Sequence, residues 1–213
     1  MPVSTPKCIF YWETKTLTVQ MRLWKAKLNM YKYLQQLPED SLAKEIFEEQ
    51  KRNKFPGLVT ECEIKAKELG ISNELENMNV RKVEFKNIVK SAVHKKNEEL
   101  LRLEMKKYSK LKDLVGDDYC KKEYLKDLSV QEARVKFRTR CYMTELAFNF
   151  RNKPEYANNC WMCQSCFMAV DTFSHVKWCV AHEDLREGRD LSRDKDLVCY
   201  ISEVMNRRQK KDK

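Results

Sequence analysis

Cysteine and histidine residues gather near the C-terminal end of the sequence, with types and spacing that suit a metal ion. Two residues separate Cys163 from Cys166, three separate His175 from Cys179, and eight lie between the two pairs. The first pair forms a compact knuckle and the second can face inward from one helical turn, so together they supply the four tetrahedral ligands of zinc. The pattern predicts one structural Zn²⁺, because four protein ligands leave no open position for chemistry.

Two neighbouring residues are alternative ligands. Two residues separate Cys160 from Cys163, and two separate Cys179 from His182, so each also forms a pair with suitable spacing. We prefer the set that begins at Cys163, because Trp161 then precedes the knuckle and packs over it. The nine cysteines are odd in number, and the N-terminus lacks the apolar run of a secretory signal, so metal binding is favoured over a disulfide framework.

Basic residues alternate with apolar and aromatic ones just before this cluster. Residues 134–153 carry a net charge of +5, and residues 86–112 and 207–213 carry +6 and +4. Arginine binds phosphate with two parallel hydrogen bonds, and aromatic rings stack on bases, so the stretch 134–153 is a candidate nucleic-acid contact. The candidate residues are Arg134, Lys136, Arg138, Arg140, Arg151 and Lys153. For residues 86–112, a solvated helix face is an equally good interpretation.

The composition of the 213 residues indicates what positions these groups. The chain has only 4 Gly and 5 Pro, which favours a mainly α fold: a helical bundle with a small C-terminal zinc-binding subdomain. The net charge is +10, and there is no apolar run long enough for a membrane span. We therefore expect an intracellular protein with no membrane partner.

Apolar periodicity and end signals divide the chain into expected helices. Gly70 is expected to end one of them, Ser129 and Glu132 form a capping box at the start of another, and Ser192 is expected to cap the last. Residues 95–97 are a possible break, and the charged tail beyond Asn206 is expected to fray. The expected helices span 17–37, 41–54, 58–69, 80–111, 117–128, 129–150 and 192–206.

Three regions follow from this pattern. We expect an N-terminal helical region at 1–77, long basic helices at 78–153, and a zinc subdomain with a final helix and basic tail at 154–213. No catalytic residue is predicted. The triplet Gly116–Asp118 matches a polymerase motif in letters only, because helix ends flank it in place of the apolar strands that such a metal site needs.

The sequence resembles the region that follows the polymerase domain in reverse transcriptases of non-LTR, LINE-type retrotransposons. The likeness covers nearly the whole chain, and its most specific part is the motif that runs from Trp161 through Cys163, Cys166, Thr172 and His175 to Cys179. Further stretches that carry it are Pro2–Trp12, Met21–Leu28, Leu37–Ala43, Tyr124–Arg134, Phe137–Arg138, Leu185–Leu191, Asp196–Val198 and Arg207–Arg208.

The resemblance implies a thumb-like bundle that holds primer and template, and a cysteine–histidine motif that contacts nucleic acid. It assigns the metal to Cys163, Cys166, His175 and Cys179, and phosphate contacts to Arg134, Arg138 and Arg140. The family's polymerase palm lies upstream of this region and is absent here. The chain, beginning at Met1, therefore resembles a truncated or independently expressed remnant, and we expect no enzymatic activity.

Two functions remain as expectations. The first is a non-catalytic, zinc-stabilised segment that grips RNA or DNA phosphates. The alternative is a zinc-stabilised helical scaffold for protein interaction, in which an exposed patch at Ile9–Trp12 with Trp24 binds a partner or the missing palm. The basic run Arg207–Lys211 weakly favours the nucleus over the cytoplasm.

Overall fold

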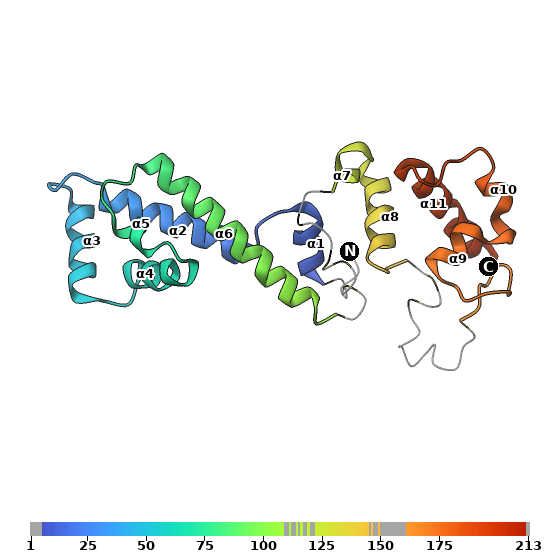
Figure 1. Cartoon of the computed structure of the whole chain (residues 1–213), viewed down its shortest axis with the longest axis horizontal. Helices are drawn as coiled ribbons and strands as arrows, with labels where there is room; N and C mark the ends of the chain where they lie inside the picture. The colour runs from blue at the N-terminus through green and yellow to red at the C-terminus, as the bar shows by residue number, and fades with distance from the viewer. Residues whose placement is uncertain are drawn as a thin grey trace. The chain divides into compact units, whose positions relative to one another are not determined.

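The computed structural model shows a mainly α-helical protein, as the sequence predicts (Figure 1). Within the residues described, the β-type pairing is limited to an isolated antiparallel bridge between Met162 and Val170. None of the described helices is both long and apolar enough to cross a membrane. The structure describes residues 6–108, 111, 114, 116, 119, 122–144, 146, 149 and 161–211, except for the side chains of 210 and 211.

The chain divides into two compact units, which we name unit one (Met1–Cys120) and unit two (Lys121–Lys213). This division differs from the expected ranges 1–77, 78–153 and 154–213. The long basic region does not stand apart in the structure, because its first helix packs on the N-terminal helices and its last helix packs on the C-terminal one. Each unit therefore contains one part of that region.

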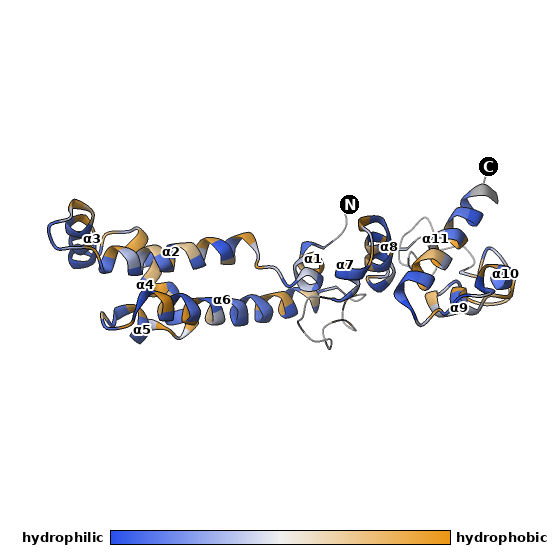
Figure 2. Cartoon of the chain, turned by 90° about the horizontal axis from the view of Figure 1, so that it is seen from above, coloured by the Kyte–Doolittle hydropathy of each residue, from blue (hydrophilic) through white to orange (hydrophobic). Residues whose placement is uncertain are grey.

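Unit one is built around two long helices, α2 and α6, which pack against each other (Figure 1). Hydrophilic and hydrophobic segments follow one another along both helices, as expected for helices with one polar and one apolar face (Figure 2). Their apolar faces join a core that includes Leu28, Tyr31, Phe47, Phe85 and Val89. The helices of unit one are α1 (Lys7–Thr14), α2 (Val19–Gln35), α3 (Leu42–Asn53), α4 (Leu58–Leu69), α5 (Ser72–Glu76) and α6 (Lys82–Met105).

Only part of the expected interaction patch at Ile9–Trp12 is at the surface, where Phe10 is 42% exposed. Ile9 and Trp12 are fully buried, because α1 packs against α6. The guanidinium of Arg102 on α6 lies 4.7 Å from the centre of the Trp12 ring, within the range of a cation–π contact. Helix α1 therefore turns Ile9 and Trp12 inward and leaves Phe10 exposed, and the binding of a partner at this patch stays a prediction.

Helix α6 runs without a break through residues 95–97, where the sequence suggested one. The Asn97 side chain is buried, and its oxygen accepts a hydrogen bond from the Thr18 backbone N–H at 3.0 Å. Its amide group donates to the Tyr119 hydroxyl at 2.9 Å. Asn97 therefore accepts a hydrogen bond from the backbone at the start of α2, and α6 continues past it without a break.

Unit two contains shorter helices around the C-terminal one. Helix α8 begins with the expected capping box: the Ser129 N–H donates to Glu132 Oε2 at 2.8 Å, and the Glu132 N–H donates to Ser129 Oγ at 3.4 Å. Its helices are α7 (Tyr124–Asp127), α8 (Val130–Arg140), α9 (Phe173–Trp178), the short 3₁₀ helix η4 (Val180–His182), α10 (Glu183–Arg186) and α11 (Asp194–Lys211).

Helix α8 ends at Arg140, well before residue 150, so the expected end was wrong. Tyr142 has a left-handed backbone with a φ of 54°, and the Met143 N–H donates to the Arg138 carbonyl at 2.8 Å. This bond satisfies one of the last carbonyls of the helix and turns the chain away. The residues after the turn are free to pack separately, and Leu146 joins the core of unit two.

Helix α11 differs from its prediction at both ends. It begins at Asp194, because Ser192 donates its hydroxyl to Asp190 Oδ1 at 2.6 Å and stays outside the helix. It continues to Lys211, and Arg208 is buried, so the expectation of fraying directly beyond Asn206 was wrong. The core beneath α11 includes Leu197, Tyr200, Ile201 and Val204 together with Val176 of α9.

Candidate metal centre

A short hairpin carries the first two cysteines. The Cys163 N–H donates to the Ala169 carbonyl at 2.7 Å, and the Asp171 N–H donates to the Trp161 carbonyl at 2.7 Å. These bonds flank the bridge between Met162 and Val170 and close the loop between them. The hairpin therefore holds Cys163 and Cys166 close together on one small turn.

Backbone amides point at both sulfur atoms of this turn. The Ser165 N–H donates to Cys163 Sγ at 3.4 Å, and the Met168 N–H donates to Cys166 Sγ at 3.4 Å. Hydrogen bonds from amides stabilise a thiolate relative to a thiol. The turn is thus built to hold sulfur in the form that binds metal.

Helix α9 supplies the other two groups. Its first turn is capped by Thr172, whose hydroxyl accepts a hydrogen bond from the His175 N–H at 3.1 Å. His175 lies inside the helix, and Cys179 follows its last residue. Residues four apart lie on one face of a helix, so both side chains reach the hairpin from the same side.

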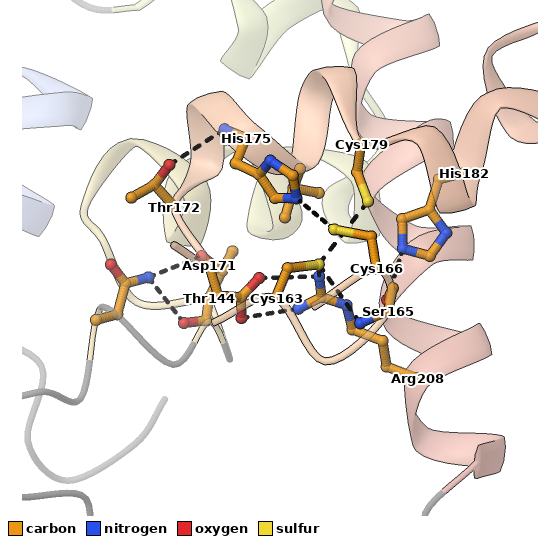
Figure 3. Close-up of polar contacts among 12 residues, drawn as sticks. Thr144, Cys163, Ser165, Cys166, Asp171, Thr172, His175, Cys179, His182 and Arg208 are labelled. Atoms are coloured by element: carbon orange, nitrogen blue, oxygen red, sulfur yellow. Dashed lines mark hydrogen bonds and ion pairs between the residues drawn. The ribbon is translucent and has the colours of Figure 1, made fainter. Parts of the chain in front are cut away.

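The four side chains meet in a small volume (Figure 3). Cys163 Sγ and Cys179 Sγ are 3.8 Å apart, and Cys166 Sγ and His175 Nε2 are 3.2 Å apart. All four ligand atoms lie within 4.8 Å of one another. Two sulfur ligands at about 2.3 Å from a tetrahedral ion lie about 3.8 Å apart, so the sulfur–sulfur distance fits a shared metal.

The pKa values of the Cys179 and Cys166 thiols are shifted in opposite directions. Burial raises the pKa of Cys179 to about 12, and its side chain is fully buried. At Cys166 burial also acts upward, but hydrogen bonds from the Met168 amide and from the thiols of Cys179 and Cys163 leave its pKa below the usual value. Since metal binds the thiolate, an ion must displace protons, and Cys179 holds its proton more firmly than Cys166 does.

A buried ion pair supports the hairpin from the side of α11. Arg208 donates to both carboxylate oxygens of Asp171 at 2.9 Å, and one of its nitrogens donates to Cys163 Sγ at 3.2 Å. Asp171 is 1% exposed and Arg208 6% exposed. A two-pronged guanidinium–carboxylate contact has fixed geometry, so it orients the arginine toward the sulfur (Figure 3).

Two further contacts tie α9 to the rest of unit two. The Tyr200 hydroxyl of α11 donates to the Val176 carbonyl, and Arg186 of α10 donates to the Cys179 carbonyl at 2.6 Å. Both carbonyls are at the end of α9, where a helix lacks internal donors. The helix that carries His175 is therefore held at its C-terminal end by α10 and α11.

Of the two alternative ligands, His182 stands apart from this group. His182 is buried, but its Nε2 is 2.9 Å from Ser165 Oγ, and the cluster of possible ligands does not include it. It braces the hairpin through Ser165. Cys160 lies outside the described residues, so the structure does not test it as a ligand. The four preferred residues are the ones that the described part of the chain brings together.

The candidate phosphate contacts of α8 have different surroundings. Arg134 is exposed, and the half-buried Lys136 pairs with Asp194 of α11 at 2.6 Å. Arg138 is half-buried and lines a cavity, and Arg140 is half-buried at the end of the helix. An internal carboxylate therefore already neutralises Lys136. Arg151 and Lys153 lie outside the described residues.

The sequence interpretation missed Asp171 and Arg208. They are 37 positions apart, and neither belongs to the cysteine–histidine spacing. The only local signal was an arginine at a position that shares a helix face with Tyr200, Ile201 and Val204, where an apolar residue would be usual.

Comparisons with protein-family models, curated proteins and solved structures gave no match for this chain.

Proposed function

We propose that this chain is a non-catalytic nucleic-acid-binding protein segment whose C-terminal unit is held together by one structural Zn²⁺. The metal ligands are Cys163, Cys166, His175 and Cys179. In this proposal, the basic helix α8 binds phosphate groups of RNA or DNA, and the surface around the metal centre contacts bases. No side chain has a catalytic role.

The donor set is the argument for zinc. Three thiols and one imidazole are soft and borderline donors, which suit Zn²⁺ better than Mg²⁺ or Ca²⁺, whose ligands are oxygen atoms. Four protein ligands close the coordination sphere, so the bound ion stabilises the fold and activates no water. Hairpin 161–171 contains no helix and a single bridge, so it needs such a crosslink to stay folded.

The observation that carries the nucleic-acid proposal is the exposure of large apolar side chains beside the metal ligands. Phe167 follows Cys166 and is 72% exposed, Met168 is 74% exposed, and Trp178, just before Cys179, is 68% exposed. Aromatic side chains of this kind serve as stacking platforms for unpaired bases. The metal fixes the residues on either side and so presents these rings on a rigid support.

Two arginines of α8 supply charge within the same unit. The side chains of Arg134 and Arg138 make no hydrogen bond or ion pair with any described residue. They are four positions apart and so share one face of the helix. A guanidinium without an internal carboxylate keeps its full capacity for a phosphate.

The resemblance to the region after the polymerase palm of LINE-type reverse transcriptases agrees with this proposal. In that setting the partners are RNA, DNA and the palm itself, and the site of action is the nucleus. The basic run Arg207–Lys211 is the sequence feature that favours the nucleus. Its first residue, Arg207, pairs with Asp184 at 2.9 Å. A protein scaffold is the competing proposal, since Phe167, Met168 and Trp178 would also suit an apolar protein surface.

Salt dependence separates these two functions. The affinity of the zinc-loaded chain for labelled single-stranded RNA and for duplex DNA is measured over a range of salt concentrations. The test variants are Arg134→Gln/Arg138→Gln and Phe167→Ala/Trp178→Ala, and the control is Arg52→Gln/Lys54→Gln, which removes two exposed charges from α3 and its C-terminal cap. Every variant is first checked for helicity and for zinc content.

We expect log affinity to fall linearly with log salt. The arginine variant should lower the slope by about 0.7 to 0.9 for each lost phosphate contact, while the control keeps the full slope. The aromatic variant should weaken single-strand binding about tenfold with little change in slope. A folded, zinc-loaded protein that binds neither nucleic acid at low salt would exclude the proposal and leave the protein scaffold.

A further inference from the structure

A cavity of about 210 Å³ lies between α8 and α11 in unit two. It has no part in the metal centre, since none of its lining residues is a ligand or contacts one in the described hydrogen bonds. Its volume is below the range of about 300 to 1,000 Å³ typical of drug-sized ligands. The space therefore suits one small ring system. The lining residues are Val135, Arg138, Met143, Thr144, Ile201, Ser202, Met205, Asn206 and Gln209.

Part of the lining is apolar. Val135 of α8 and Ile201 of α11 contribute branched side chains, and Met143 and Met205 contribute thioethers. Methionine adapts its shape to a flat ring and makes favourable contacts between sulfur and aromatic groups. These four side chains would cover the faces of a planar ligand but offer little to its polar edge.

The remaining lining supplies polar groups for such an edge and for an adjoining phosphate. The guanidinium of Arg138 and the carboxamide of Asn206 make no hydrogen bond or ion pair with any described residue. Arg138 is half-buried, so its donors are partly removed from water without a protein acceptor. Asn206 carries a donor and an acceptor on one side chain, which can read a ring edge with two hydrogen bonds.

Two hydroxyl groups complete the polar side. The Ser202 hydroxyl donates to the Val198 carbonyl at 2.8 Å, which leaves its oxygen as an acceptor. The Thr144 oxygen accepts from the Asn149 side-chain amide at 3.1 Å, which leaves its proton to donate. The cavity thus presents donors and acceptors together, with one positive charge and no carboxylate among its lining residues.

We propose that this cavity binds one unstacked nucleobase of a single-stranded nucleic acid, with the adjoining phosphate at Arg138. A base has two apolar faces and an edge of donors and acceptors, which matches the apolar and polar parts of the lining. Arg134 lies one turn earlier on the same helix face and takes the phosphate of the next nucleotide. The inference rests on the proposed function and makes it specific for single strands.

The test compares two oligonucleotides of equal length and charge. One is a single strand with bases, and the other carries abasic residues throughout. Ser202→Trp fills the cavity, and Asn206→Ala removes its carboxamide without added bulk, so the test survives if the larger substitution prevents folding. Ser192→Trp and Gln131→Ala make the same kinds of change at exposed positions outside the cavity and serve as controls.

We expect the original chain to bind the strand with bases about tenfold more tightly than the abasic strand. Ser202→Trp and Asn206→Ala should each lower this preference, leaving the part that Phe167 and Trp178 supply, and should keep the salt slope, since the phosphates remain bound. The controls should retain the preference. A preference unchanged in both cavity variants would overturn the cavity proposal alone, since Phe167 and Trp178 would then account for it. Equal binding of both strands by the original chain would overturn the cavity proposal and the stacking of bases on Phe167 and Trp178 together. Binding of neither strand would overturn the proposed function with it.

Discussion

At the scale of single residues, Arg208 connects the metal centre to the C-terminal helix. A metal with three thiolates carries a net negative charge, and burying that charge costs free energy unless donors surround it. The guanidinium donates to Cys163 Sγ at 3.2 Å and is held there by Asp171. Outer residues of this kind orient a ligand and raise its affinity for the metal.

Replacing Arg208 therefore has a predicted effect on metal binding. We expect Arg208→Gln to lower the affinity for Zn²⁺ by about 10- to 100-fold, because Cys163 loses a charged donor and Asp171 loses its partner. The affinity is measured by competition with a coloured chelator. Arg207→Gln is the matched control, since Arg207 is the next residue of α11 and pairs with Asp184 instead. Equal affinities of the two variants would contradict this role.

Cys62 gives a pH dependence to the stability of unit one. Burial raises the pKa of its thiol from 9.0 to about 12, although the charge of Lys27 acts in the opposite direction. Between about pH 9 and 12 the unfolded chain loses this proton while the folded chain keeps it. The unfolded state then binds fewer protons, so the free energy of unfolding falls as the pH rises through this interval.

Denaturant unfolding followed at several pH values checks this prediction. Cys62→Ala should show a shallower decline of the unfolding free energy between pH 9 and 12 than the original chain. Cys199→Ala, at an exposed position of α11, should decline as the original does. An identical decline in Cys62→Ala and in the original chain would assign the effect to other groups.

At the scale of helices and loops, the sequence predicted the end of a helix well where the residue after the helix is of a type that commonly ends helices. Helix α4 spans Leu58–Leu69 as expected, because Gly70 adopts the left-handed conformation with a φ of 70°. The end of α8 was not predicted, because Tyr142 also adopts the left-handed conformation, which is uncommon for tyrosine and so cannot be expected from the residue type. The cysteine spacing likewise predicted which four side chains meet, since ligand geometry constrains neighbours in sequence.

Long-range contacts decided what the sequence left open. No helix was expected at residues 72–76, but they form α5, whose end is held by a lysine from another helix. The buried Lys32 ammonium donates to the carbonyls of Glu74, Leu75 and Asn77, the last at 2.6 Å. The contact joins residues more than forty positions apart, as does the one between Arg208 and Cys163. Periodicity within one segment carries no information about such partners.

The capping box of α8 leads to a prediction at this scale. Ser129→Ala should lower the stability of unit two by about 1 kcal/mol, because the first turn loses an acceptor for its free N–H groups. Gln131→Ala, two positions later at an exposed site, should have little effect. Chemical denaturation followed by far-ultraviolet circular dichroism measures both. Equal stability of Ser129→Ala and Gln131→Ala would contradict this prediction. It would mean that water satisfies the first-turn N–H groups as well as the Ser129 hydroxyl does.

At the scale of the whole molecule, each unit contains a hydrophobic cluster of its own. The described cluster of unit one includes buried residues from Leu17 to Val93, and that of unit two includes buried residues from Leu146 to Val204. The described metal cluster lies entirely in unit two. Hairpin 161–171 and α9 contribute few apolar residues to that core, so we expect the ion to supply much of what holds them.

Removal of the metal should therefore unfold one part of the chain and leave the other. On treatment of the zinc-loaded protein with a strong chelator, hydrogen exchange should accelerate in hairpin 161–171 and in α9, where the ligands lie. Helices α2 and α6 should keep their protection, because their core includes no metal ligand. Added Zn²⁺ should restore the slow exchange and added Mg²⁺ should not, since the donors are sulfur and nitrogen.

The variant Cys163→Ser provides the control without a chelator and should behave like the metal-free protein in the same two segments. Slow exchange in α9 after chelation would mean that Tyr200, Arg186 and the core beneath α11 suffice to hold this helix, and the ion would then have no structural role. Fast exchange in α2 and α6 as well would mean that the two units unfold together. Either result would contradict an independent, metal-dependent unit two.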